Sequence, residues 1–230
     1  MFVPKSILFL PLLLVNAQAA PSTRLQQHIM SSTTTSDGPA KQVRDELKKS
    51  EVIPTVVDDF IPSLLLSVSW PNTNQEASLG NTLKPDDLQD APSVSVKPIA
   101  PLNSSGEGET NLVIVTTDPD APSRDDPKWS EFCHWIGVTS SSSEGKALKL
   151  DDVMPYKPPG PPEKTGKHRY VFLALVPANG TTEELSLSKP SERKHWGYGD
   201  DGVKGVREWA GENGLVVVAA NFIYAQNKKQ

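Results

Sequence analysis

The chain has 230 residues, a length that suits one sizeable domain or two small ones. Its 21 prolines against 15 glycines favour a turn-rich fold over a helical bundle. The formal net charge of −5 gives no electrostatic reason to expect a nucleic-acid partner. The single cysteine, Cys133, cannot form an intramolecular disulfide, so the fold must be stable without one.

The N-terminus has the pattern of a secretory signal peptide. Lys5 supplies a short positive region, residues 7–15 form an apolar core, and residues 17–19 read Ala-Gln-Ala, a cleavage site of the A-x-A type. The apolar run is short for a bilayer span, and the absence of Arg from residues 1–20 disfavours a mitochondrial presequence. We therefore expect a signal peptide over residues 1–20 and an extracellular or vacuolar destination, with an N-terminal anchor as the alternative.

Residues 21–39 are rich in Ser, Thr and Gln and are predicted to be a disordered tail, followed by a single domain over residues 40–230. Two sequons, at Asn103 and Asn179, fit the secretory route. Because the motif is short and arises by chance, each asparagine is a glycosylation candidate only.

The domain is predicted to consist mainly of strands joined by turns. Helices are expected over residues 40–50 and 203–213, with a turn or short helical piece over 55–62 and a polar loop over 72–91. Strands are predicted over residues 64–70, 93–97, 112–117, 132–138, 148–153, 167–176 and 215–225. Strands outnumber helices, so the pattern indicates one β-rich domain.

An acidic, proline-containing turn follows the buried strand over residues 112–117. Asp118 and Asp120 are each followed closely by a proline, Pro119 and Pro122, and prolines restrict both their own backbone and the residue before them. The two carboxylates are therefore predicted to lie close together on a stiff turn. The alternative is a purely structural role, in which these aspartates only accept hydrogen bonds from the backbone of their own turn.

Strand alternation places further polar side chains. In the strand over residues 132–138, His134 is expected on the face of Ile136, opposite Cys133 and Trp135. In the later strand, His168 and Tyr170 share a face and Arg169 points away. If the two strands are neighbours in one sheet, these groups and the two aspartates line one pocket with the rigid loop 155–162 as its wall. Imidazoles, a phenol and backbone N–H groups suit a phosphate-bearing or zwitterionic head group.

Three other interpretations remain at this point. A His/Asp set could bind a metal ion, although no H-x-x-x-H or C-x-x-C spacing is present. A pair of Cys133 and His134 could act as nucleophile and base, but neighbouring strand residues point to opposite faces. The histidines could also simply be packed in the core. Core packing is the expected role of four tryptophans, Trp129, Trp135, Trp196 and Trp209.

Specific motifs make the chain resemble the phosphatidylethanolamine-binding protein (PEBP) family. DPDAPSR at residues 118–124 and GPPEKTGKHRYVF at 160–172 are together highly specific, and WSEFCH at 129–134 extends the match. GNTL at 80–83, WGYG at 196–199 and ANFIYA at 220–225 resemble the fungal branch of the family. The resemblance covers residues 49–226.

The resemblance implies a mainly β fold of the α+β type, in which a large antiparallel sheet packs with a smaller sheet and short peripheral helices. It also implies a small cavity for phosphate-like anions and phospholipid head groups, without a cofactor or catalytic turnover. Peripheral membrane contact would follow from such a ligand. Because the chain ends at Gln230, where animal members continue into a helix, the mouth of the cavity is expected to be more open. The cavity residues carried over by the motifs are Asp118, Asp120, His134, Pro161, Pro162, His168 and Tyr170.

The fungal branch includes an inhibitor of a serine carboxypeptidase, which implies a second possible role. Such inhibition would use surfaces outside the cavity, so the pocket would be vestigial if inhibition were the only function. We therefore expect a non-catalytic binding protein with a head-group pocket that can also inhibit a serine carboxypeptidase. A protease inhibitor acting through its surface is the alternative, and a histidine-dependent hydrolase is a minor one.

Overall fold

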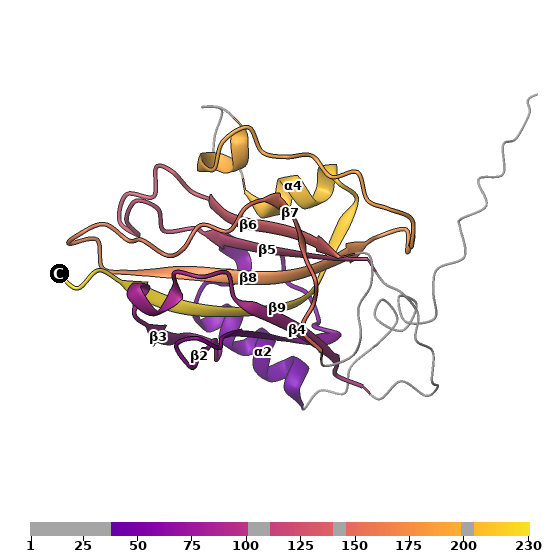
Figure 1. The fold of residues 1–230 in the computed structure, drawn as a ribbon, viewed down its shortest axis with the longest axis horizontal. Helices are drawn as coiled ribbons and strands as arrows, with labels where there is room; N and C mark the ends of the chain where they lie inside the picture. Colours follow the sequence, from indigo (N-terminus) through magenta and orange to yellow (C-terminus); the bar gives the residue numbers. More distant parts are fainter. Residues whose placement is uncertain (1–37, 101–110, 140–145, 199–204) are drawn as a thin grey trace, which may run out of the picture.

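The computed structural model describes residues 38–100, 111–139, 146–198 and 205–230, which form two β-sheets with short helices (Figure 1). The strands of the large sheet, in spatial order, are β3 (Asn81–Leu83), β9 (Leu215–Gln226), β8 (Lys167–Pro177), β5 (Leu112–Asp118), β6 (Phe132–Thr139) and β7 (Asp151–Met154). Those of the small sheet are β2 (Gln75–Glu76), β1 (Leu64–Trp70) and β4 (Ser93–Pro98). The prediction of a β-rich fold with a large and a small sheet is confirmed.

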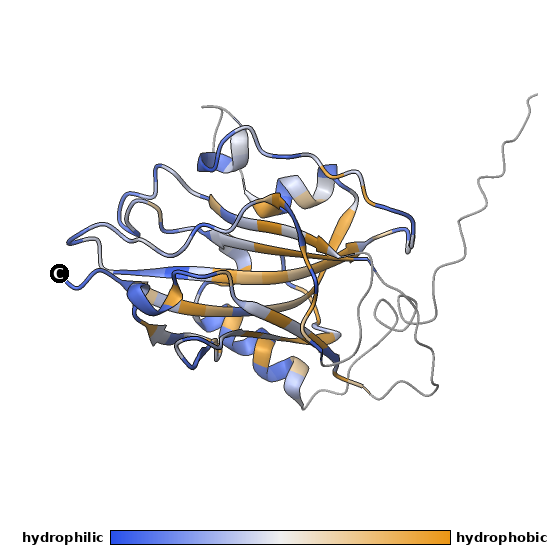
Figure 2. Ribbon diagram, in the orientation of Figure 1, coloured by the Kyte–Doolittle hydropathy of each residue, from blue (hydrophilic) through white to orange (hydrophobic). Residues whose placement is uncertain are grey.

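The centre of the large sheet consists of strands that are covered on both faces. Every residue of β5 is buried, as is every residue of β8 after Lys167. Hydrophobic residues accordingly concentrate along the middle of the sheet (Figure 2). Uncharged, β-branched sequence is favoured where both faces of a strand leave water, which explains why these strands could be predicted from the sequence.

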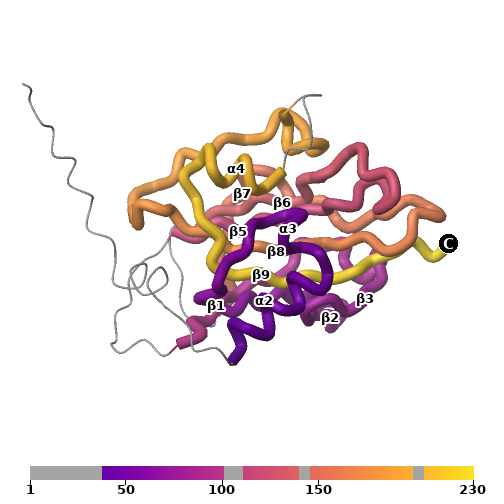
Figure 3. The backbone as a smooth tube through the Cα atoms, turned by 180° about the vertical axis from the view of Figure 1, so that it is seen from behind, coloured from indigo at the N-terminus to yellow at the C-terminus, as the bar shows by residue number. Residues whose placement is uncertain are grey.

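Each face of the large sheet has its own hydrophobic core. The small sheet covers one face, where Val68 and Trp70 of β1 pack with Ile114 and Phe172 of the large sheet. The opposite face is covered by helices, as the view from behind shows (Figure 3). These are α2 (Pro39–Lys49), α3 (Val52–Thr55) and α4 (Val206–Glu212). Trp196 of the 3₁₀ helix η2 (Lys194–Gly197) belongs to the same core, whereas Leu88 of the 3₁₀ helix η1 (Pro85–Leu88) belongs to the core beside the small sheet. Within the described residues, no helix is long and apolar enough to span a membrane.

The predicted helices are present, with adjusted ends. The first begins at Pro39, where the fixed φ of proline suits the first helical position, and it buries Val43 and Leu47. The last buries Val206, Trp209 and Ala210 as predicted, but its described part is shorter than the expected range 203–213. The signal peptide, nearly all of the tail over 21–39, Asn103, the serine run over 140–143 and Val203 lie outside the described residues.

The segment over residues 72–91 differs from the predicted polar loop, because it contains β2, β3 and η1. β3 pairs in parallel with the end of β9, Asn81 opposite Ile223, so its hydrogen bonds come from a strand far along the chain. Gly80 permits this approach: its φ is +100°, and a Cβ there would lie 2.7 Å from the Phe222 ring. Such a short edge strand has no periodic sequence signal.

A β-bulge changes the predicted faces of β6. Thr116 pairs with Trp135, and the next residue of β5, Thr117, pairs with Cys133, so His134 is an extra residue between them. As a result, Trp135 packs in the core beside the small sheet, whereas Cys133 and Ile136 both pack in the core under the helices. The expectation that His134 shares the face of Ile136 is therefore wrong, because one extra residue reverses the alternation beyond it.

Candidate functional site

The site lies where β5 ends and where β6 and β8 begin. Antiparallel pairing brings these three strand ends to the same edge of the large sheet. Asp118 is the last residue of β5, His134 lies near the start of β6, and His168 and Tyr170 lie near the start of β8. The structure brings these four side chains together around one cavity, and all four are buried.

Asp118 is held by its own turn and by His168. One of its carboxylate oxygens, Oδ1, accepts a hydrogen bond from the backbone N–H of Asp120 at 2.7 Å. The other, Oδ2, lies 2.9 Å from His168 Nδ1, and both side chains are at most 3% exposed. Both the capping role and the pocket role considered from the sequence are thus combined in one carboxylate.

Both ring nitrogens of His168 have polar partners. Nδ1 lies beside the Asp118 carboxylate, and Nε2 lies 3.0 Å from the hydroxyl of Thr165. That hydroxyl is also 2.9 Å from the carbonyl oxygen of Pro162. The orientation of the His168 ring is therefore fixed from two sides, by the acidic turn and by the proline-rich segment over residues 155–162.

His134 is held by the backbone of the proline-rich segment. Its Nδ1 lies 2.7 Å from the carbonyl oxygen of Lys157, and the backbone N–H of Lys157 donates to the His134 carbonyl at 2.8 Å. Burial lowers the pKa of His134 to about 4, despite the nearby charge of Asp118. The ring is therefore neutral at physiological pH, and it meets the Tyr170 ring edge-on at 5.1 Å between centroids.

Tyr170 completes the buried polar floor. Its ring stacks with His168 at 6.4 Å between centroids and an interplanar angle of 16°. Burial, together with the negative charge of Asp118, raises the pKa of Tyr170 well above its usual value. The phenol therefore keeps its hydrogen, and it lies beside the Asp118–His168 pair.

A proline-rich segment forms the wall of a cavity of about 500 Å³ above this floor. Asn227 near the chain end contacts that wall, donating from Nδ2 to the Pro161 carbonyl at 3.1 Å. The predicted residues that line the cavity are Asp118, His134, Pro161, Pro162, His168 and Tyr170. Lys157 and Gly160 also line it, as part of the predicted wall over residues 155–162. Lining residues that sequence reasoning did not single out include Phe132, which lies close to His134 in β6, and Gln89, which comes from a distant segment with no sequence signal.

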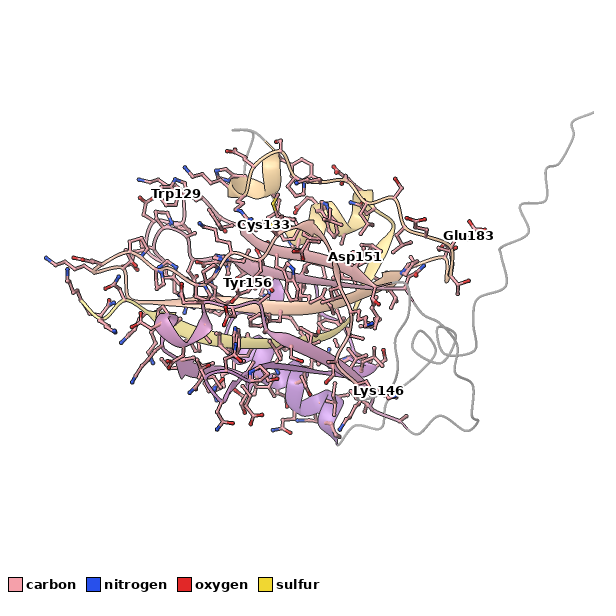
Figure 4. All side chains as sticks on the ribbon, viewed as in Figure 1. Trp129, Cys133, Lys146, Asp151, Tyr156 and Glu183 are labelled. Carbon is pink, nitrogen blue, oxygen red and sulfur yellow. The ribbon has the colours of Figure 1, made fainter. Side chains whose placement is uncertain are left out.

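Trp129 also lines the cavity, so its predicted core role is wrong. Its side chain is only partly buried, and the ammonium group of Lys194 lies 4.3 Å from its ring centroid. Figure 4 shows Trp129 toward the end of the sheet that also holds the C-terminus, with Glu183 at the opposite end. The other three tryptophans, Trp135, Trp196 and Trp209, are buried as expected.

Asp120 is the one predicted pocket residue that does not line the cavity. Its carboxylate forms a two-point ion pair with the Arg169 guanidinium, at 2.6 Å to Nη2 and 2.9 Å to Nε. Arg169 also donates to the carbonyls of Ser50 and Glu51 at the end of α2. Asp120 thus lies on the helix side of the sheet, where its pair with Arg169 links the acidic turn to the end of α2.

The geometry does not support the two alternatives of a Cys133–His134 nucleophilic pair and a metal site. Cys133 is fully buried in the core under the helices, and burial raises the pKa of its thiol to about 12, so the thiol stays protonated. Among the described residues there is no cluster of three or more His, Cys, Asp or Glu side chains arranged to hold a metal ion.

The fold and the site together define a class: a two-sheet β protein with a small cavity at one sheet edge, which has a proline-rich wall and a polar floor. The family model described as phosphatidylethanolamine-binding protein matches residues 73–223. The chain therefore belongs to the phosphatidylethanolamine-binding protein family.

A yeast relative agrees with this assignment. The carboxypeptidase Y inhibitor of Saccharomyces cerevisiae is 34% identical over 210 residues, which cover 80% of this chain and 94% of the inhibitor. The crystal structure of carboxypeptidase Y inhibitor complexed with the cognate proteinase superimposes with a TM-score of 0.69 at 32% identity, covering 83% of this chain and 98% of that one. A phosphatidylethanolamine-binding protein from Plasmodium vivax, 20% identical with a TM-score of 0.64 over 83% of this chain and 99% of its own, shares the fold.

Proposed function

We propose that this protein is a non-catalytic binding protein whose cavity takes a phosphate-like anion or a phospholipid head group. The observation that carries the proposal is the cavity floor, where a buried Asp118–His168 pair lies beside His134 and Tyr170. Buried, well-connected polar groups in a mostly apolar cavity are typical of sites that orient a small polar ligand. Lys157 adds a positive charge to the lining, which favours an anionic ligand.

A second function, inhibition of a serine carboxypeptidase, is supported by a different observation. The similarity to a protein named carboxypeptidase Y inhibitor extends over 80% of this chain, far beyond the residues that line the cavity. We propose that a carboxypeptidase is bound through surfaces outside the cavity, so that ligand binding and inhibition depend on different residues.

A histidine-dependent hydrolase remains a minor alternative with a clear requirement. Each cavity histidine already has Nδ1 committed, to Asp118 in His168 and to Lys157 in His134. Phospholipid or peptide turnover that disappears in His168→Ala, in a variant that still folds, would be needed to support this chemistry.

Two assays on the protein beginning near Pro21 test the two main functions. One titrates phosphoethanolamine while the histidine chemical shifts are followed by NMR. The other adds the protein to a vacuolar serine carboxypeptidase and records the residual activity. We expect His134→Ala to abolish ligand binding and to leave inhibition intact. Loss of both functions in a folded His134→Ala protein would contradict the proposal of separate surfaces.

We also propose that the protein enters the secretory pathway. The signal-peptide pattern over residues 1–20 supports this, and Asn179 is exposed in a turn, where its Oδ1 accepts from the backbone N–H of Thr181 at 3.1 Å. Expression in a eukaryotic secretory host, followed by N-terminal sequencing and glycosidase treatment, tests both the cleavage and the glycan. A product that retains residues 1–20 would contradict the proposal.

A further inference from the structure

His134 presents a hydrogen-bond acceptor to the cavity. The Lys157 carbonyl, 2.7 Å from Nδ1, can only accept, so Nδ1 carries the ring hydrogen. A neutral imidazole has one N–H, which leaves a lone pair on Nε2. Within the described residues Lys157 supplies the only hydrogen bond of this ring, and the ring lines the cavity, so Nε2 faces the ligand space.

The groups around His134 keep the ring neutral. Asp118 at the end of β5 favours a charged ring, whereas Arg193 and Lys157 oppose it, and the rings of Phe132 and Tyr170 pack against it at centroid distances of 5.0 and 5.1 Å. Burial outweighs the carboxylate and lowers the pKa of His134 to about 4. Proton uptake by this ring is therefore disfavoured near neutral pH.

The charges of the lining suit a ligand with one negative charge. Among the described residues, Lys157 is the one lysine or arginine side chain in the cavity lining, and the Asp118 carboxylate is already engaged by His168 and by the backbone N–H of Asp120. The positive charge that remains for a ligand is that of Lys157. A dianion would exceed this charge, and one of its ionised oxygens would face the lone pair of His134.

We propose that the cavity selects a phosphomonoester in its singly protonated, monoanionic form, whose P–O–H group donates to Nε2 of His134. The inference rests on the proposed anion-binding function and names its ligand class. A phosphodiester, such as the phosphate of an intact phospholipid, has no O–H to donate, and neither does sulfate. The cavity therefore favours a free monoester such as phosphoethanolamine over the intact lipid that carries the same head group.

Calorimetric titration of the purified protein with methyl phosphate, dimethyl phosphate and inorganic sulfate tests this selectivity. Methyl phosphate in its monoanionic form has a P–O–H group that dimethyl phosphate lacks. Sulfate is a tetrahedral anion of similar size that also lacks an O–H group. At about pH 6, near the second pKa of a phosphomonoester, we expect methyl phosphate to bind at least about tenfold more tightly than the other two. At about pH 8 its affinity should fall by about tenfold or more, because the monoanion is then a minor form.

A variant pair locates the effect at Nε2. In His134→Gln the side-chain amide can donate as well as accept, so the preference for methyl phosphate over sulfate should shrink to about threefold or less. The matched control is His195→Gln: the Nδ1 of His195 also lies near a carbonyl, that of Ser130 at 2.8 Å, but His195 is not part of the cavity lining. His195→Gln should keep the wild-type preference, and circular dichroism confirms that both variants are folded.

The outcomes separate this inference from the broader function. Equal affinity for methyl and dimethyl phosphate, equal affinity for methyl phosphate and sulfate, or no change between the two pH values would overturn the selectivity while leaving anion binding in place. No binding of any of the three ligands would overturn the proposed anion pocket itself.

Discussion

At the scale of single residues, the two aspartates of the acidic turn have separate roles. Asp118 pairs with His168 at the cavity floor, whereas Asp120 pairs with Arg169 beneath the helices. They are two positions apart, and alternation along β8 sends His168 and Arg169 to opposite faces of the sheet. One short turn therefore serves both the site and the attachment of α2.

The separate role of Asp120 can be tested by Asp120→Asn. This change leaves the Arg169 guanidinium buried without its counter-charge, which typically destabilises a protein by about 3 kcal/mol. We expect a drop of that size in the free energy of unfolding, measured by urea denaturation, and little change in the affinity for phosphoethanolamine.

Asp59→Asn is the matched control for this prediction. Asp59 also pairs with an arginine, Arg44, but both side chains are about 40% exposed. Water can therefore solvate the Arg44 guanidinium when the Asp59 charge is removed, and little stability should be lost. If Asp120→Asn weakened ligand binding as strongly as His134→Ala while remaining folded, Asp120 would have to be assigned to the site.

At the scale of elements, the bulge in β6 turns His134 toward the cavity. Arg193 stabilises this bulge through hydrogen bonds to its backbone carbonyls. The guanidinium of Arg193 donates to the carbonyls of Cys133 and His134 at 3.0 and 3.2 Å, and to that of Pro155 at 2.8 Å. The Arg193 carbonyl accepts from the backbone N–H of Cys133 at 2.7 Å. This one residue therefore connects the bulge to the start of the proline-rich wall.

Arg193→Met removes the guanidinium while keeping an unbranched side chain of similar reach. Three carbonyl groups lose a charged donor, so we expect the free energy of unfolding to fall by about 2 kcal/mol and the affinity for phosphoethanolamine to fall with it. Urea denaturation and calorimetric titration measure the two effects.

Arg124→Met serves as the control for the Arg193 variant, because Arg124 makes an exposed ion pair with Glu51 and no bond to the bulge. It should leave ligand affinity unchanged. A folded Arg193→Met protein with wild-type affinity would show that the bulge keeps its shape without the guanidinium.

The same elements show how far the sequence predicts this structure. β5, β8 and β9 were predictable because long uncharged runs are required where a strand is buried on both faces. The acidic turn and the His168 strand could be assigned to one site because their residue types and the family motifs agree. The bulge could not be predicted, because strand alternation gives no sign of an inserted residue until the partner strand is known.

Contacts between distant segments account for the other differences. Trp129 resembles a core residue in sequence, and only the position of the proline-rich wall makes it part of the cavity lining. Asp120 looks like a second pocket carboxylate until Arg169 is placed beside it. Similarly, β3 has three residues and depends entirely on the end of β9. Each of these features is set by a partner far away in the chain, which no local pattern reports.

At the scale of the whole molecule, two buried groups with opposite pKa shifts make opposing contributions to how stability depends on pH. Burial raises the pKa of Glu131 from 4.5 to about 8, so between these values the folded protein holds a proton that the unfolded chain releases, and stability falls as pH rises. Burial lowers the pKa of His134 from 6.5 to about 4, so stability falls as pH drops through that range. The two slopes oppose each other between pH 4.5 and 6.5 and nearly cancel.

The position of Glu131 explains why its ionisation affects the whole fold. It accepts a hydrogen bond from Thr117 of β5 at 2.9 Å, and Thr117 in turn accepts one from the Trp196 indole at 3.1 Å. The start of α4 closes over the carboxyl group, since a Cβ on Gly205 would lie 2.1 Å from its Oε1. Ionising Glu131 therefore places a charge where the sheet, η2 and α4 meet.

Glu131→Gln should remove the alkaline part of this dependence. The amide oxygen can still accept from Thr117, but the side chain no longer titrates, so the loss of stability between pH 6.5 and about 8 should largely disappear. In the wild type that loss approaches at most about 1.4 kcal/mol per pH unit, the slope for one proton. Urea denaturation at a series of pH values measures it, with the exposed Glu192→Gln as control. Parallel stability curves for wild type and Glu131→Gln above pH 6.5 would show that Glu131 is already ionised in the folded protein.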